Sequence, residues 1–128
     1  MVDLELLALA RDAATRAHCP YSRFRVGAVA LADGLPFAGC NVENASYGLA
    51  ICAERVALFS AVAAGHPRVT RLAVACVDAP PDDGPSGRMP CGACRQVMAE
   101  LMPPEAIVVV DGVGDFTLAD LLPNPFAL

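Results

Sequence analysis

Three cysteines placed around one glutamate constrain this chain more than any other feature. Cys52 lies two residues before Glu54, and Cys91 and Cys94 lie three residues apart in a distant segment. Thiolates at positions i and i+3 share one face of a helix, so Cys91 and Cys94 can bind one metal ion together with Cys52. The fold must then bring two remote segments into contact. No fourth ligand is obvious, and a corner left open for water is typical of a catalytic zinc site.

The residues that follow Cys52 suit catalysis at such a site. Glu54 can take the proton that a water molecule at the metal loses. Arg55 is the nearest donor that would offset the negative charge of three thiolates. Helices that begin near Cys52 and Cys91 would also favour thiolates through the positive ends of their dipoles. One geometric difficulty is that residues 52 and 54 lie about 200° apart on an ideal helix.

A non-catalytic alternative uses the same cysteines. A structural zinc or dithiol module needs a fourth thiolate, which Cys40 or Cys76 would supply. Glu54 would then only complement the dipole of a helix. The joint presence of Glu54 and the three thiols favours the catalytic interpretation.

Length and composition limit the architecture and the partners. The chain has 128 residues, and we expect 1–128 to form a single domain. Hydrophobic residues make up 55 % of the chain and aromatic residues only 5 %, so Ala, Val and Leu must build most of the interior. The net charge of −5 argues against a nucleic-acid partner, because binding phosphates needs a basic face. We expect a small neutral or cationic substrate instead.

The N-terminus and the cysteine usage predict the compartment. The chain begins without the basic start and apolar core of a signal peptide, and no apolar run approaches the roughly 18 residues that cross a membrane. We therefore expect a cytoplasmic protein without membrane contact, whose six cysteines stay reduced. Reduced cysteines favour metal binding or catalysis over a disulfide framework.

The apolar periodicity predicts elements in the order α-β-β-α-β-α-β, followed by a short helix. Asp3 is expected to cap the first helix, Asp33-Gly34 to form a hairpin turn, and Gly65 to end the second helix. This order predicts an α/β fold, a three-layer α-β-α sandwich with a mixed central sheet. The expected helices are 3–18, 52–64, 91–102 and 118–122, the expected strands are 26–31, 35–41, 72–77 and 107–110, and 78–90 is an exposed loop.

Several longer motifs follow one another along nearly the whole chain. They are Pro20-Tyr21-Ser22-Arg23-Phe24, Gly39-Cys40-Asn41-Val42-Glu43-Asn44-Ala45-Ser46-Tyr47, Cys52-Ala53-Glu54-Arg55, Pro90-Cys91-Gly92-Ala93-Cys94-Arg95-Gln96, and Leu121-Leu122-Pro123 with Phe126. In these motifs the chain resembles the small homotetrameric cytidine deaminases, in which the first zinc ligand is Cys rather than His.

This resemblance implies zinc-dependent hydrolytic deamination of cytidine and deoxycytidine to uridine and deoxyuridine, with release of ammonia, in pyrimidine salvage. It implies one zinc ion per chain on the three cysteines. Glu54 would deprotonate the water, protonate ring N3 and carry a proton to the leaving ammonia. Arg55 and Gln96 are expected next to the ligands. The resemblance also implies a homotetramer with shared active sites, in which Phe126 lies against the base bound by an adjacent subunit.

The resemblance further implies contacts with a nucleoside substrate. Asn41 and Glu43 resemble the pair that hydrogen-bonds the ribose 3′-hydroxyl, and residues two apart on an extended strand point the same way, which suits such a grip. Phe24 resembles the aromatic residue that packs beside the pyrimidine. The Ala53 N–H would bind the ring carbonyl.

Two segments depart from the family pattern, and one of them is the segment after Val110, which is compact. The loop 78–90 is unusually rich in proline and acidic residues, and Arg88-Met89 within it is similar to the blasticidin-type deaminases. Deamination of a cytosine nucleoside antibiotic is therefore a second candidate activity. Asn41 and Glu43 favour cytidine, because they suit a free ribose.

Overall fold

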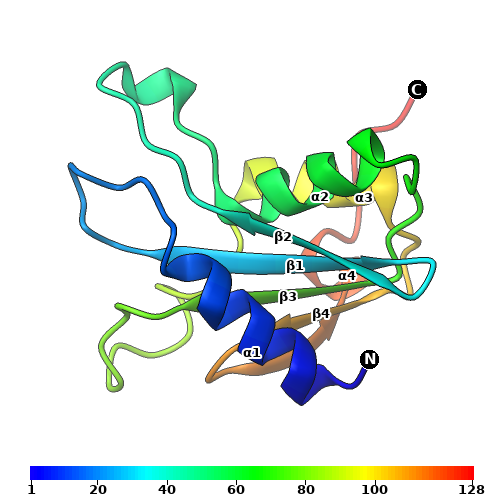
Figure 1. Ribbon diagram of the computed structural model, residues 1–128. Coiled ribbons are helices and arrows are strands. Elements are labelled where there is room, and N and C mark those ends of the chain that lie inside the picture. Colours follow the sequence, from blue (N-terminus) through cyan, green and yellow to red (C-terminus); the bar gives the residue numbers. More distant parts are fainter.

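The computed structural model describes residues 1–128 and is built on a five-stranded mixed sheet with helices on both faces (Figure 1). The strand order is β2-β1-β3-β4-β5, in which β3 and β4 are parallel and the other neighbours are antiparallel. The strands are β1 (Val26–Ala32), β2 (Leu35–Cys40), β3 (Arg71–Cys76), β4 (Ile107–Val110) and β5 (Gly114–Thr117). The helices are α1 (Asp3–Ala14), α2 (Ala53–Ala63), α3 (Gly92–Leu101) and α4 (Leu118–Leu121), with a 3-10 helix, η1, at Tyr47–Leu49.

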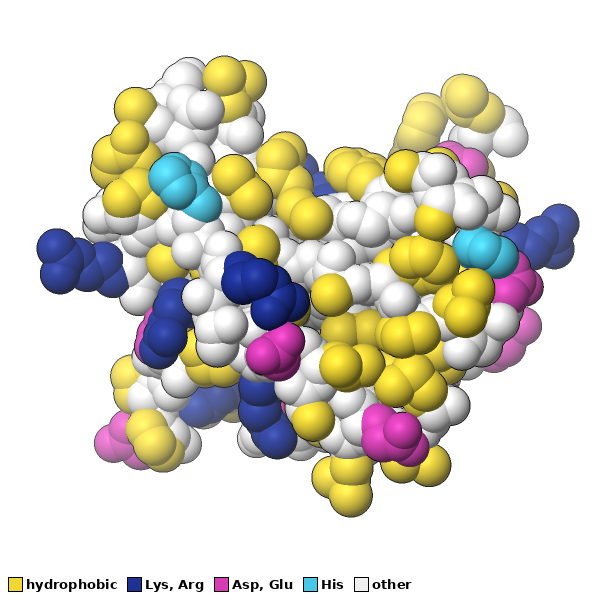
Figure 2. Space-filling model, in the orientation of Figure 1, with side chains coloured by type: hydrophobic (Ala, Val, Ile, Leu, Met, Phe, Trp, Pro, Cys, Tyr) yellow, Lys and Arg dark blue, Asp and Glu magenta, His cyan; other side chains and the backbone are white.

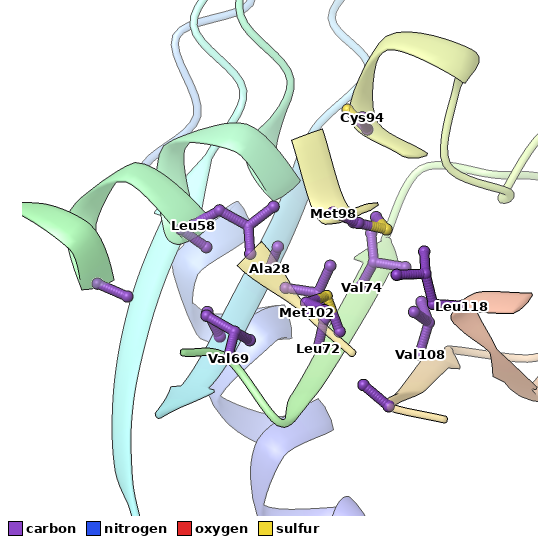
Figure 3. Packing of buried hydrophobic residues seen from close by; sticks show 14 of the residues in the cluster. Ala28, Leu58, Val69, Leu72, Val74, Cys94, Met98, Met102, Val108 and Leu118 are labelled. Carbon is purple, nitrogen blue, oxygen red and sulfur yellow. The ribbon is translucent and has the colours of Figure 1, made fainter. Parts of the chain in front are cut away.

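The sheet separates two hydrophobic cores, because successive side chains of a strand point to opposite faces. On one face, Leu6 and Ala10 of α1 pack against Val29 and other strand residues. The other face carries the larger core, which α2 and α3 cover. Figure 3 shows part of this core, with Cys94 at its edge beyond Met98 of the same helix. This arrangement confirms the predicted three-layer sandwich.

Two glycines allow helices to lie unusually close to the sheet. A side chain at Gly27 would collide with the backbone of Ala10 in α1, and one at Gly39 would collide with that of Ala57 in α2. A Cβ atom on Gly39 would also lie 2.7 Å from the Ala53 carbonyl oxygen. Because Ala53 is the first residue of α2, this contact fixes the start of the helix on the sheet.

Two local predictions about turns are confirmed. The Asp33-Gly34 turn has φ angles of 52° and 75°, and it joins β1 to β2 with Ala32 opposite Leu35. Positive φ at both positions is the geometry of a tight hairpin turn. Gly65 follows α2 with a φ of 89°, as expected for a residue that ends a helix.

Two predictions about the first helix were wrong, because long-range partners outweigh the local pattern. Helix α1 ends at Ala14 rather than His18, since the backbone N–H of His18 bonds the Asn41 carbonyl oxygen at 3.0 Å. Asp3 does not cap the helix. It is the first helical residue, and its carboxylate accepts hydrogen bonds from Arg71 at 2.6 and 3.2 Å.

The sequence pattern missed β5. Its four residues are exposed or half-buried and start with glycine, so they lack the apolar alternation of a strand. Pairing with β4, in which Val110 lies opposite Gly114, creates the strand. The other predicted strands and the remaining helices end within one residue of their predicted limits.

Three loops, 15–25, 41–52 and 77–91, lie at one end of the sheet, on the left in Figure 1. The N-terminus lies toward the other end, and the C-terminal segment leaves the body beside α3, where Phe126 accepts a hydrogen bond from Gln96. Acidic and basic side chains are interspersed on the face in Figure 2, where the projecting C-terminal segment is mainly apolar. No helix has both the length and the apolarity needed to cross a lipid bilayer.

Candidate active site

The three predicted metal ligands meet at the N-terminal ends of α2 and α3. Cys52 and Cys91 immediately precede these helices, and Cys94 is buried in the first turn of α3. All three Sγ atoms lie within 4.8 Å of one another, and those of Cys52 and Cys91 are 3.9 Å apart. Sulfur atoms at about 2.3 Å from one tetrahedral zinc ion have such separations. The donor set and its spacing therefore fit one zinc ion.

Cys40 and Cys76, the two alternative fourth ligands, form hydrogen bonds with backbone carbonyl oxygens away from the three thiols. The Cys40 thiol donates to the Arg16 carbonyl oxygen at 3.6 Å, and the Cys76 thiol donates to the Arg88 carbonyl oxygen at 3.8 Å. Neither belongs to the group of converging ligands. Burial raises the pKa of Cys76 to about 11, which favours its neutral thiol. The geometry thus provides three thiol ligands and no fourth.

Glu54 is the one buried charged residue, with 5 % of its surface exposed. Burial raises the pKa of its carboxyl group to about 7, and the negative charge of Cys52 acts in the same direction. The expected geometric difficulty is absent, because Cys52 precedes the helix with an extended backbone (φ −74°, ψ 153°). The 200° separation of an ideal helix therefore does not apply between residues 52 and 54.

Arg55 lies beside the thiols, as predicted. Its Nη2 donates to the Cys52 Sγ at 3.3 Å, while its buried Nε has no hydrogen-bond partner. A hydrogen bond from Cys94, with the Arg55 guanidinium, lowers the pKa of Cys52. The hydrogen bond with Cys52 and burial raise the pKa of Cys94. One cation thus offsets part of the negative charge that a set of thiolates would concentrate here.

A cavity of about 260 Å³ opens onto Cys52 and Cys91 between the three loops. The cavity is lined by Glu54 and by the four residues predicted to bind substrate within one chain, namely Phe24, Asn41, Glu43 and Ala53. Its lining residues are Phe24, Val26, Asn41, Glu43, Ala50, Ile51, Cys52, Ala53, Glu54, Cys76, Gly87, Arg88, Met89 and Cys91. An adjoining hollow of about 320 Å³ shares Glu43 and Ala50 with this cavity and contains none of the thiols.

Asn41 and Glu43 also hold the loop that carries Phe24. The Asn41 amide accepts from the Val26 N–H at 2.9 Å and donates to the Phe24 carbonyl oxygen at 2.8 Å. Glu43 Oε1 accepts two backbone N–H groups of the 15–25 loop, each at 3.1 Å. The Ser22 hydroxyl, together with these backbone bonds, lowers the pKa of the Glu43 carboxyl group. β2 ends before Asn41, so the predicted strand over 35–41 is one residue too long.

Two predicted residues lie away from the cavity of their own chain. Gln96 was expected beside the ligands, but its side-chain amide donates to the Phe126 carbonyl oxygen at 3.0 Å. Phe126 itself is 73 % exposed and contributes nothing to the cavity lining. The amide of Gln96 therefore fastens the C-terminal segment to α3.

Sequence patterns missed one wall of the cavity and the contacts that hold it. Gly87, Arg88 and Met89 belong to the proline-rich loop, and the similarity of Arg88-Met89 to the blasticidin-type deaminases did not predict that they line the cavity. At the start of this loop, Asp78 accepts three hydrogen bonds from Arg25, at 2.8, 2.9 and 2.8 Å. An arginine and an aspartate 53 positions apart carry no local signal, so this clamp was not predictable from periodicity.

Comparison with known protein families gives a match over most of the chain. The family model described as the cytidine and deoxycytidylate deaminase zinc-binding region matches residues 1–110. Cytidine deaminase from Halalkalibacterium halodurans is 46 % identical over 115 residues, covering 86 % of this chain and 83 % of that protein. Cytidine deaminase from Mycobacterium tuberculosis is 47 % identical over 120 residues, covering 93 % and 85 %.

Solved structures agree with these sequence relationships. The crystal structure of cytidine deaminase from Burkholderia pseudomallei superimposes with a TM-score of 0.87 at 46 % identity, covering 98 % of this chain and all of that chain. The M. tuberculosis enzyme gives a TM-score of 0.83 at 39 % identity, with complete coverage of both chains. The predicted enzyme class and the predicted zinc cofactor are thereby confirmed. The chain belongs to the zinc-binding cytidine and deoxycytidylate deaminase family.

Proposed function

We propose that residues 1–128 form a single catalytic domain that hydrolyses cytidine and deoxycytidine to uridine and deoxyuridine with release of ammonia. The observation that carries this proposal is a buried carboxylate, Glu54, beside three converging thiols, two of which line the same cavity as Glu54. We place the reaction in pyrimidine salvage in the cytoplasm, where six reduced cysteines are stable.

The chemistry divides between a metal and one carboxylate. Cys52, Cys91 and Cys94 would hold one zinc ion per chain, which when bound lowers the pKa of a water molecule to near neutrality. Glu54 accepts the proton of that water, donates it to ring N3, and carries a second proton to the departing amine. Burial beside the thiols keeps this carboxyl group within the cavity and away from bulk water.

The remaining cavity residues bind the nucleoside. Both backbone hydrogen bonds to Glu43 end on Oε1, which leaves Oε2 to accept from the ribose 3′-hydroxyl. Asn41 keeps one amide hydrogen for the same hydroxyl. Phe24 packs beside the pyrimidine, and the Ala53 N–H at the start of α2 binds the ring carbonyl. Arg55 offsets the charge of the thiolates.

Ammonia release from cytidine by the purified protein tests this activity. We expect equimolar uridine and ammonia, and no turnover after the zinc is removed. A protein that holds one zinc ion per chain and releases no ammonia would support the structural zinc module instead.

We also propose that four copies assemble and share their active sites. Phe59 and Val62 of α2 and Phe126 near the C-terminus are exposed apolar side chains, which favours a covered surface. In the assembly, Phe126 of one chain stacks on the base bound by another. Such stacking contributes about 1–3 kcal/mol.

Sedimentation and steady-state kinetics test the assembly together. Phe126→Ala should weaken cytidine binding with little change in kcat, and deletion of residues 123–128 should also loosen the oligomer. A fully active monomer, or unaltered kinetics in Phe126→Ala, would refute shared active sites.

A further inference from the structure

The proline-rich loop 78–90 forms one wall of the cavity, although few of its backbone groups can bond one another. Four of its residues are prolines, which have no N–H donor. The loop therefore has more carbonyl acceptors than internal donors, and such a loop needs donors from side chains to hold one conformation. Its last residues, Gly87, Arg88 and Met89, line the cavity.

Arg88 supplies the missing donors. Its Nη2 donates to the carbonyl oxygens of Ala79 at 3.2 Å and Pro80 at 2.7 Å, and its Nη1 donates to that of Gly84 at 2.9 Å. One guanidinium group thus joins the start of the loop to its apex. A planar group with five N–H donors in a fixed fork can reach three acceptors in this way, and an ammonium group cannot do so with the same geometry.

The stem and backbone of Arg88 are held as well. A Cβ atom at Gly112, in the turn between β4 and β5, would lie 3.6 Å from Arg88 Nε, so the side chain passes over this turn. The Arg88 carbonyl oxygen accepts the Cys76 thiol at 3.8 Å, at the end of β3. No carboxylate pairs with Arg88, although Asp82 and Asp83 lie in the same loop. Its guanidinium therefore serves the loop carbonyls alone.

We propose that Arg88 is a positioning residue for substrate recognition, which fixes the wall formed by Gly87, Arg88 and Met89. This inference rests on the proposed function. Met89 lies two residues before Cys91, so the wall leads directly into the segment that carries two of the thiols, while Asn41 and Glu43 belong to a different loop, 41–52. The carbon that loses its amine belongs to the base and must lie at the thiols, so we expect this wall to enclose the pyrimidine base rather than the sugar. Glu54 and the thiols stand on α2 and α3, so loss of Arg88 leaves the reacting groups in place.

The test compares Arg88→Gln with Arg68→Gln, an exposed arginine outside the cavity. Arg88→Gln should raise the KM for cytidine and the Kd for uridine about tenfold, the loss of roughly one or two hydrogen bonds, with kcat within about twofold. Limited proteolysis within 79–87 should be faster, and the zinc content should be unchanged. Arg68→Gln should match the wild type in every measurement.

Arg88→Lys separates the fork geometry from the charge, and it decides the question if Arg88→Gln does not fold. We expect a KM for cytidine between those of the wild type and Arg88→Gln. Unchanged KM and Kd in both variants, or a fall in kcat at constant KM, would overturn the proposal. A wild-type protein that binds uridine without deaminating cytidine would refute the proposed function. In that case the uridine Kd values of the wild type and the Arg88 variants would still show whether Arg88 positions the wall for binding.

Discussion

The floor and the rim of the cavity are built by different physical means. The floor consists of Cys52, Glu54 and Cys91, with the buried Cys94 next to them, at the starts of α2 and α3. Helix α2 packs on the sheet through main-chain contact at Gly39, and both helices contribute buried apolar side chains to the larger core. The rim consists of the loop residues 15–25, 41–51 and 77–90, which are held largely by hydrogen bonds from side chains. Chemistry that tolerates little displacement thus stands on regular elements, while the surface that meets the substrate depends on a few polar links.

Removing a metal ligand should have the largest effect. Cys94→Ala leaves two thiols, which hold zinc poorly, so we expect loss of stoichiometric zinc and of all activity. Metal analysis of the purified variant measures this directly. Cys40→Ala is the matched control, because its thiol bonds only the Arg16 carbonyl oxygen. Zinc loss in Cys40→Ala would show that zinc binding depends on more than the three cysteines.

Removing the proton carrier should have the next largest effect. Glu54→Gln keeps the size of the side chain but cannot carry protons, so turnover should fall by about 10²–10⁴-fold or more while zinc remains. Arg55→Gln should cost less, because Arg55 offsets charge and moves no proton. Parallel assays of ammonia release and zinc content separate the two roles. Near-normal turnover in Glu54→Gln would contradict proton transfer by Glu54.

The main-chain contact between Gly39 and α2 can be disturbed without changing any of the thiols or the Glu54 carboxylate. Gly39→Ala places a methyl group against the backbone of Ala53 and Ala57, so α2 must move, at a cost of about 1–3 kcal/mol in unfolding free energy. Turnover should fall with it, because Glu54 moves with the helix. Gly48→Ala is the control, since nothing lies within 4 Å of the added Cβ. Equal unfolding free energies of the two variants, measured by denaturant unfolding, would show that the contact at Gly39 does not stabilise the floor.

The rim clamp between Arg25 and Asp78 should give the smallest effect, visible mainly in acid. Hydrogen bonds from Arg25 lower the pKa of Asp78 from 3.8 to about 2. A carboxyl group whose pKa is lowered by folding stabilises the fold at pH values above its ordinary pKa. This stabilisation is lost as the pH falls through the pKa of the group in the folded protein. Asp78→Asn should therefore lower the Tm slightly at pH 7, and the difference from wild type should shrink between pH 4 and 2. Asp82→Asn should leave the Tm unchanged throughout this range, and a pH-independent difference for Asp78→Asn would exclude the clamp as its cause.

The same contrast explains what was predictable from the sequence. The floor is encoded in short contiguous motifs, because the residues before and within a first helical turn share a site by local geometry. The structure accordingly brings Cys52, Cys91 and Cys94 together, and Glu54 lines the same cavity as Cys52 and Cys91. The rim depends on pairs that are distant in sequence, such as Arg25 with Asp78, and on backbone acceptors that any residue offers. The hydrogen bonds of Arg88 to the loop carbonyls were not predictable for the same reason, although Arg88-Met89 is similar to the blasticidin-type deaminases.

Local patterns failed elsewhere where a distant partner decides the structure. β5 exists because β4 offers an edge, and its own residues do not alternate. Asp3 looked like a cap and is an ion-pair partner of Arg71.

The close approach of α2 to Gly39 has a consequence for how this enzyme tolerates sequence drift. A contact between main chains is independent of which side chains fill the surrounding layer, provided that the glycine is kept. Exchanges among Ala, Val and Leu elsewhere in the larger core can then accumulate as neutral variation without displacing the catalytic helix. We expect laboratory evolution of this protein to accept many core substitutions and to reject those at Gly39.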